Sequence, residues 1–162
     1  MCIRDRYNRE GKKLYDPIFD NVDPLNFSPL YCTEIAGKFG FLDESGKEIY
    51  PVEIDEIDFE NYSPLRMFKK DDKYGFFDEN GETIFKPTFN EIKRVWTETI
   101  IVKKDKKWGA IDLDGKFKLE TQFDNLTYNT TYNSFKALEG EKEYFFDDKG
   151  IRIKNPIFDI VE

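Results

Sequence analysis

The sequence predicts an all-β protein, a tandem array of about five three-stranded antiparallel meanders. Two observations carry this prediction: short apolar runs rich in aromatic residues alternate with charged turns, and the turns recur at a nearly fixed interval. Their closing glycines are separated by 35, 35, 34 and 35 residues. Such a period is typical of stacked supersecondary units that are each too small to bury their own apolar face. We expect an open or superhelical repeat, with a closed propeller-like ring as the alternative.

Each recurring turn has the residues that a hairpin reversal needs. An Asp or Asn stands at its first position and Gly at its fourth, which suits a type I turn followed by a residue at positive φ. The first side chain can also accept a hydrogen bond from the backbone N–H two residues further on. The five turns lie at residues 8–11, 43–46, 78–81, 112–115 and 147–150.

Residues 64–92 show one whole unit. Two strands joined by a tight turn are followed by the recurring turn and by a third strand at 82–85. Pro87 then precedes two apolar residues, Phe89 and Ile92. Because proline cannot donate a hydrogen bond into a central ladder, we interpret this segment as the end of the third strand and a short turn to the next unit.

The strand that enters each recurring turn carries an aromatic residue followed by glycine. A glycine inside a strand usually marks a close approach to the backbone, and we expect a large side chain of a neighbouring strand to fill that space. The last unit has Glu143 and Tyr144 at these positions and so lacks the pair. The complete pairs, which we predict to be the structural signature of the repeat, are Phe39 with Gly40, Tyr74 with Gly75 and Trp108 with Gly109.

The combined pattern, Lys-Trp-Gly-x-x-Asp-x-x-Gly followed by Pro-x-Phe-Asp-x-Ile, resembles the bacterial WG β-repeat, also called the KWG repeat. The resemblance extends over residues 7–162, and Trp108 with Gly109 carries the match in its core. It implies a β-repeat fold. It implies no catalytic residues, because the family has none in common.

The chain divides into a leader at residues 1–6 and a single repeat array at 7–162. The leader shares nothing with the repeats and is similar to the translation of a sequencing adapter, so we expect the native N-terminus to be missing and the chain to be a fragment. The compartment, cytoplasmic or exported, therefore stays open. The units lie at about 7–29, 30–63, 64–97, 98–132 and 133–162.

The charge balance excludes two classes of partner. Lys and Arg total 25 against 33 Asp and Glu, which gives a net charge of -8. This average field repels phosphate backbones and anionic headgroups, so we expect no nucleic acid partner. No run approaches the roughly 20 apolar residues of a membrane span, so we expect no membrane insertion of this segment.

Cys2 and Cys32 are too few for a disulfide framework.

The residues of the common catalytic and metal sites are scarce. The sequence has no histidine, which removes Ser–His and Cys–His nucleophiles and the usual zinc shells. Paired carboxylates such as Asp71 and Asp72 could cleave a glycosidic bond, but they lie in predicted solvated turns where nothing raises a pKa. Asp112 and Asp114 match only the middle of a calcium loop. We predict a protein that is not an enzyme, with no cofactor and no metal site.

The candidate partner or ligand surface is Trp96, Tyr128 and Tyr132. These aromatic residues lie in segments between units rather than at the signature positions, and Trp and Tyr supply large contact areas at low entropic cost. The leading hypothesis is a non-catalytic repeat module for protein–protein interaction or scaffolding, with an unknown protein as partner. The alternative is a carbohydrate-binding or envelope-associated module.

Acidic residues recur nine and ten places after the turn glycines. They could form a ladder that faces a basic partner, or they could cap turns as solvated carboxylates. They are Asp20, Asp55, Glu56, Glu91, Asp124 and Asp159.

Overall fold

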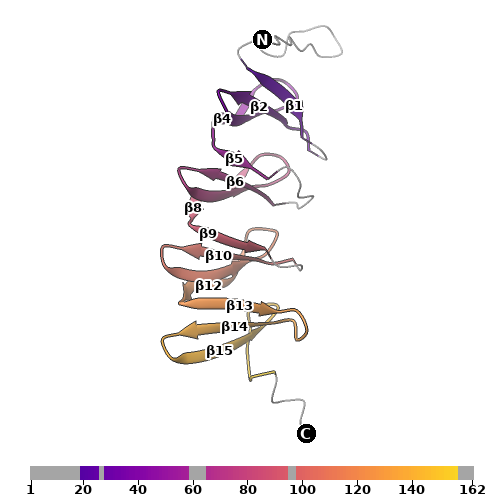
Figure 1. Ribbon diagram of the computed structural model, residues 1–162. Helices are drawn as coiled ribbons and strands as arrows, with labels where there is room; N and C mark the ends of the chain where they lie inside the picture. The colour runs from indigo at the N-terminus through magenta and orange to yellow at the C-terminus, as the bar shows by residue number, and fades with distance from the viewer. Residues whose placement is uncertain (1–18, 26–27, 59–64, 95–97, 157–162) are drawn as a thin grey trace. The chain divides into compact units, whose positions relative to one another are not determined.

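The computed structural model describes residues 19–25, 28–58, 65–94 and 98–156, and these residues form sixteen β-strands and no helix. The strands make four antiparallel sheets, each with four strands in sequence order (Figure 1). The prediction of an all-β array of antiparallel meanders is confirmed. The leader at 1–6 and the turn at 8–11 lie outside the described residues. Within the described part of the chain, no helix has the length and apolar character needed to cross a bilayer.

The sheets follow one another along the chain. Sheet one contains β1 (Asn21–Pro24), β2 (Tyr31–Ile35), β3 (Lys38–Leu42) and β4 (Glu48–Ile54). Sheet two contains β5 (Glu56–Ile57), β6 (Arg66–Lys70), β7 (Lys73–Phe77) and β8 (Thr83–Phe89). Sheet three contains β9 (Glu91–Arg94), β10 (Ile100–Lys104), β11 (Lys107–Ile111) and β12 (Phe117–Phe123). Sheet four contains β13 (Asn125–Asn129), β14 (Ser134–Glu139), β15 (Lys142–Asp147) and β16 (Arg152–Ile153).

Each sheet has one strand more than the three predicted. The additional strand is the first of each sheet, and it contains the apolar residue that the sequence interpretation placed in a turn between units. A single residue separates this strand from the last strand of the sheet before it, so the chain passes from sheet to sheet without a loop. The apolar residues are Val22, Ile57, Ile92 and Leu126, and the separating residues are Asp55, Asn90 and Asp124.

The prolines do not end the third predicted strand. Pro51 lies inside β4 and Pro87 inside β8, and both strands are at the edge of their sheets. An edge strand tolerates proline because one side of it makes no ladder, so the missing N–H donor leaves no hydrogen bond unmade. The strand therefore continues past the proline to Ile54 or Phe89.

The recurring turns have the predicted geometry. In the turn that begins at Asp43, one carboxylate oxygen accepts hydrogen bonds from the N–H groups of Ser45 at 2.8 Å and Lys47 at 3.0 Å. Gly46 has a φ of 84°, which glycine adopts without steric cost. The same bonds recur at Asp78, Asp112 and Asp147, and the φ angles of Gly81, Gly115 and Gly150 are 86°, 77° and 83°.

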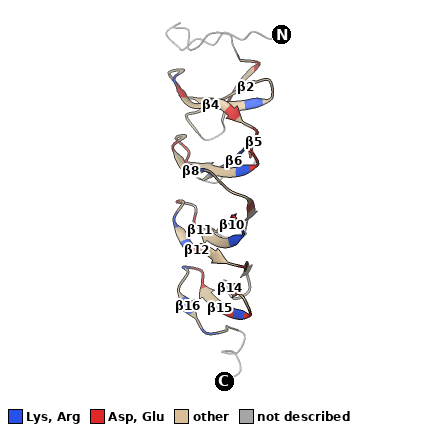
Figure 2. Cartoon of the chain, turned by 90° about the vertical axis from the view of Figure 1, so that its left-hand side faces the viewer, with Lys and Arg blue, Asp and Glu red and all other residues tan. Residues whose placement is uncertain are grey.

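The chain forms two compact units, residues 1–87 and 88–162, and each has its own apolar core. Charged residues lie mainly at strand ends and turns (Figure 2). In the first unit, sheets one and two meet through Leu25, Leu30, Cys32, Phe41, Ile54, Phe68 and Phe77. In the second unit, sheets three and four meet through Ile101, Trp108, Ala110, Leu119, Phe123, Leu126, Phe135 and Ala137.

Candidate functional site

The signature glycines lie where the fourth strand crosses the third. A Cβ added to Gly109 would stand 2.6 Å from the backbone oxygen of Leu119, and one added to Gly40 would stand 2.9 Å from that of Tyr50. The prediction that a side chain fills this space is therefore wrong for both positions, because backbone fills it. At Gly75 the nearest atoms belong to the Phe68 ring, at 2.6 Å, and the Phe85 backbone oxygen lies at 2.8 Å, so a side chain fills the space there together with backbone.

Two of the signature aromatic residues, Phe39 and Trp108, pack in the core of their own unit. Trp108 is 6% exposed, and its ring lies in the apolar core between sheets three and four. The ammonium groups of Lys93 and Lys103 lie 4.1 Å and 5.1 Å from the ring centroid, which adds cation–π attraction to the packing. Phe39 packs against the core of the first unit, and Tyr74 is half-buried. For Trp108 and Phe39 the environment is that of a packing residue.

The recurring acidic residues at the junctions between sheets cap turns. The Asp124 carboxylate accepts a hydrogen bond from the backbone N–H of Gly140 at 2.8 Å and pairs with Lys107 at 2.6 Å, and these two bonds lower its pKa. Asp55 pairs with Lys38 and accepts from the Asp71 N–H at 2.8 Å, and its pKa is also lowered. The turn-capping interpretation is confirmed at these positions.

Of the three candidate surface residues, the structure brings two together. Tyr128 and Tyr132 line one pocket of about 360 Å³ in sheet four, whereas Trp96 lies outside the described residues. Tyr128 is half-buried, with its ring 4.8 Å from that of Phe135, and Tyr132 is 36% exposed. Tyr128 is therefore fixed by the core, and Tyr132 offers its side chain to solvent.

The pocket opens on the face of sheet four that lies opposite to sheet three. Leu126, Tyr128, Phe135, Ala137, Tyr144 and Phe146 pack against sheet three, and side chains alternate along a strand. Their neighbours therefore lie on the opposite face, which we call the far face; they are Thr127, Ser134, Lys136, Glu143 and Phe145.

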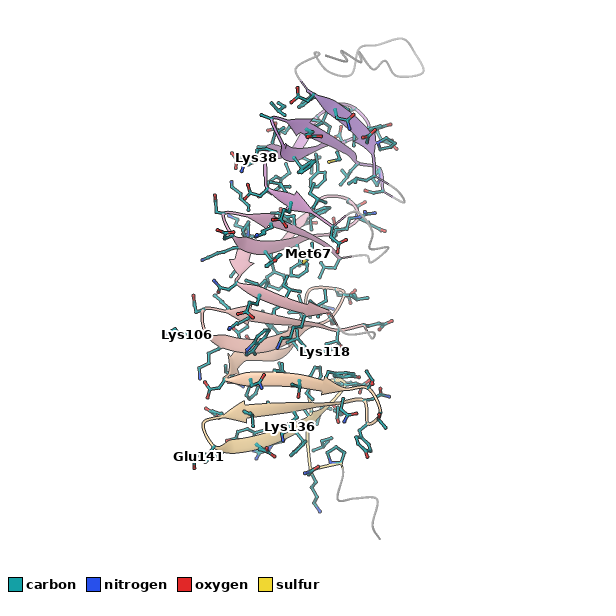
Figure 3. The ribbon with its side chains drawn as sticks, viewed as in Figure 1. Lys38, Met67, Lys106, Lys118, Lys136 and Glu141 are labelled. Atoms are coloured by element: carbon teal, nitrogen blue, oxygen red, sulfur yellow. The ribbon has the colours of Figure 1, made fainter. Side chains whose placement is uncertain are left out.

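A polar pair occupies the middle of the far face. Lys136 on β14 pairs with Glu143 on β15 at 2.6 Å, and Figure 3 labels Lys136 on its strand. The same positions in sheet three hold Ile101 and Trp108, which pack against sheet four. Sheet four thus presents polar groups where sheet three presents an apolar surface.

Sequence reasoning missed Lys136, Ser134 and Phe145, which line the pocket beside the two tyrosines. The available signal was the loss of the aromatic–glycine pair in the last unit, at Glu143 and Tyr144. That loss marks the sheet whose far face differs from the others, but only the strand register shows which side chains share this face with Glu143.

The cysteine in the first unit is not activated. Burial raises the pKa of Cys32 to about 12, and the carboxylates of Asp23 and Glu34 contribute to the increase. The thiol is therefore protonated at neutral pH, and a protonated thiol is a poor nucleophile. Within the described residues, no group of three or more Cys, Asp and Glu side chains is arranged to hold a metal ion.

The geometry of the repeats agrees with the family comparison. The WG containing repeat family matches residues 39–74, 74–108 and 108–133 in three consecutive copies. The chain belongs to this family. A comparison with curated proteins finds no match.

Solved structures similar to the chain include Hsv2 from Kluyveromyces lactis, with 10% identity and a TM-score of 0.39 over 88% of this chain and 53% of that chain. A eukaryotic initiation factor has 12% identity and a TM-score of 0.40 over 73% of this chain and 36% of that chain. A chain in a Saccharomyces cerevisiae structure of Dbp5 bound to Nup159, Gle1, IP6 and ADP has 16% identity and a TM-score of 0.36, over 86% of this chain and 42% of that chain. The chain spans about half or less of the length of these structures.

Proposed function

We propose that this chain is a non-catalytic WG repeat module that binds a protein partner through the far face of sheet four. The observation that carries the proposal is the pocket on this face, which Tyr132 and Phe145 line. Tyrosine contributes a large, rigid contact area and a polar end, and it is enriched where proteins bind one another. Phe145 adds an apolar surface to the same pocket, and Lys136 adds a polar rim.

The ionisable groups support a non-catalytic role. A general acid at neutral pH needs a raised carboxyl pKa, whereas the pKa values of Asp43, Asp55 and Asp124 are lowered by hydrogen bonds and ion pairs. Cys32, with its raised pKa, is not a nucleophile. These groups have the protonation states of structural residues.

A selection of random linear peptides on the chain tests this proposal. Peptides enriched on the native protein are titrated calorimetrically against the native chain, Tyr132→Ala and Phe117→Ala. Tyr132 and Phe117 are both 36% exposed in the second unit, so they form a matched pair. We expect Tyr132→Ala to weaken binding about tenfold, or about 1.4 kcal/mol, because an exposed aromatic anchor is lost. Phe117→Ala should bind like the native chain.

Two results would contradict the proposal. The first is that no peptide is enriched on the native chain. The second is that the enriched peptides bind to Tyr132→Ala as tightly as to the native protein, or lose affinity equally in Phe117→Ala, because binding would then not depend on the pocket in sheet four.

A carbohydrate ligand is the second candidate, and the polar groups of the pocket lining favour it. Thr130 and Asn129, with a hydroxyl and an amide side chain, line the pocket together with Tyr132. Aromatic rings stack on sugar faces while such groups bond to sugar hydroxyls. Titration of soluble glycans against the native chain and Tyr132→Ala tests this candidate. Glycan binding that is lost in the variant supports it, and the absence of binding rejects it.

A further inference from the structure

Strand β13 is the first strand of sheet four and lies at its edge. In the part of the chain that the structure describes, it pairs with β14 alone, from Asn125↔Leu138 to Asn129↔Ser134. It has five residues, whereas β1, β5 and β9 have four, two and four. The other side of an edge strand offers backbone N–H and C=O groups to an added strand.

Proteins usually protect such edges against pairing. Charged residues, prolines and very short strands are the common devices, because each of them disfavours an incoming strand. β13, with the sequence Asn-Leu-Thr-Tyr-Asn, contains no charge and no proline. Each of the other edge strands in the described sheets has at least one: Pro24 in β1, Pro51 in β4, Glu56 in β5, Pro87 in β8, Lys93 in β9, Glu120 in β12 and Arg152 in β16.

The unprotected strand also lines the pocket of sheet four. Thr127, Tyr128 and Asn129 of β13 contribute to the pocket, together with Tyr132 and Phe145. A strand added beside β13 would therefore place alternate side chains next to the pocket. The charge of Lys136 in the lining is already balanced by Glu143. Strand and pocket together thus suit an uncharged occupant.

We propose that β13 accepts an extended, uncharged segment of a partner protein as an additional strand of sheet four, with one apolar side chain of that segment in the adjoining pocket. This inference rests on the proposed function and specifies its mode of recognition. Main-chain hydrogen bonds supply affinity in this mode, and the pocket for alternate side chains supplies specificity.

The test uses the peptides that are enriched from the random library on the native chain. Each backbone amide of such a peptide is methylated in turn, and the affinity of each product is measured. A strand presents alternate N–H groups to its neighbour, so methylation should weaken binding at least tenfold at every second residue and should be tolerated in between. Hydrogen exchange of the complex should show new protection at amides of Asn125–Asn129.

A charged variant of the edge gives a second measurement. Thr127→Lys places a lysine at the repeat position of Lys93 in β9, and the Thr127 side chain is exposed. It should reduce peptide affinity at least tenfold. Gln122→Lys, an equal change of charge at an exposed position in β12, should not.

The outcomes separate the two proposals. If peptides bind in a Tyr132-dependent way but tolerate methylation at all positions and bind Thr127→Lys normally, strand addition is overturned and the proposed function stands. If no peptide is enriched, both are overturned. Alternating sensitivity with protection at β13 supports both.

Discussion

Sheets three and four share one repeat pattern but end differently. In sheet three, β12 has seven residues and crosses β11 through two register shifts, so that Trp108 pairs with Phe123. In sheet four, β16 has two residues and pairs with β15 only at Phe145 and Phe146. The glycine that permits the crossing in sheet three, Gly109, corresponds to Tyr144 in sheet four.

This difference shows what the aromatic–glycine pair does. The glycine makes room for the fourth strand, because a Cβ at Gly109 would stand 2.6 Å from a backbone oxygen of that strand. The aromatic residue then covers the face that the next sheet packs against. In sheet four the Tyr144 ring is covered by the Arg152 guanidinium, 4.8 Å from its centroid, and β15 is only half-buried towards its end. In sheet three the glycine therefore admits the fourth strand, and the aromatic residue packs against the following sheet.

The comparison of sheets three and four predicts that the largest effect on stability comes from the aromatic position of the signature. Trp108→Ala should lower the free energy of unfolding by about 3–5 kcal/mol, because it removes a buried ring and leaves a cavity between sheets three and four. Glu143→Ala, at the same repeat position in sheet four, should cost about 0.5 kcal/mol or less, since it removes a partly exposed ion pair. Urea denaturation of both variants measures the difference. Equal losses would show that the two positions are equivalent.

The glycine position should give the next largest effect. Gly109→Val should lower stability by about 3 kcal/mol, since the added atoms meet backbone that cannot move aside. Gly75→Val should also lower stability, because the Phe85 backbone oxygen would lie 2.8 Å from the added Cβ even if the Phe68 ring shifts, and alanine should cost less than valine at either position. The midpoints of thermal unfolding of these variants give the order of their stabilities.

A control separates crowding from backbone strain. Gly37 has a φ of 76° and no atom within 4 Å of an added Cβ, so Gly37→Ala tests the conformational effect alone, at about 1 kcal/mol. If the thermal unfolding midpoint of Gly109→Val is no lower than that of Gly37→Ala, the explanation that the backbone of the fourth strand crowds Gly109 is wrong.

The junction carboxylates should make stability depend on pH. The folded-state pKa values of Asp55 and Asp124 are lowered below the ordinary value of 3.8, so their contribution is complete above the unfolded pKa and is lost as pH falls through the folded pKa. The melting temperature should therefore be nearly constant above about pH 5 and should fall below about pH 4. Asp124→Asn should flatten this decline. Identical pH profiles for the variant and the native chain would exclude a role for the Asp124 charge.

The smallest effect is expected from a reversal in sheet four. Tyr144→Gly removes the side chain that stands at the crossing position, so the fourth strand should extend beyond Ile153. Hydrogen exchange should then show added protection at Lys154 and Asn155 only, although the loss of the Tyr144 ring from the core also lowers stability. Unchanged exchange at both amides would mean that Tyr144 does not end the strand.

Local features of the fold were predictable from the sequence, and features that depend on distant pairing were not. The turn at Asp43 is specified by residues within a few positions of one another, so its bonds could be predicted. The first strand of each sheet was missed because Ile57 pairs with Phe68 across a connection that has no repeat signature. The strand was predicted to end near Pro51, which is wrong, because only the sheet order shows that β4 is an edge strand that tolerates proline.

The candidate site was predictable only in part, for the same reason. Tyr128 and Tyr132 were selected as aromatic residues outside the signature. Their shared pocket depends on Lys136 and Phe145, which come from different strands and meet through the register of sheet four. The unprotected edge at β13 could be recognised only after the strand order was known.

The one-residue joints between sheets restrict how this array can change in length. Adding or deleting a residue at Asp55, Asn90 or Asp124 would turn over every side chain of the following strand. The repeats differ in length by one residue, and this difference does not lie at a joint. In each copy the joint side chain accepts a hydrogen bond from a backbone N–H in the following hairpin. The two residues are 15 positions apart for Asn90 and 16 apart for Asp20, Asp55 and Asp124. The missing residue falls between Asn90 and Asp105, within the hairpin half of the repeat. Within this chain, the one difference in this spacing thus lies in the hairpin part of a copy and leaves the joint itself unchanged.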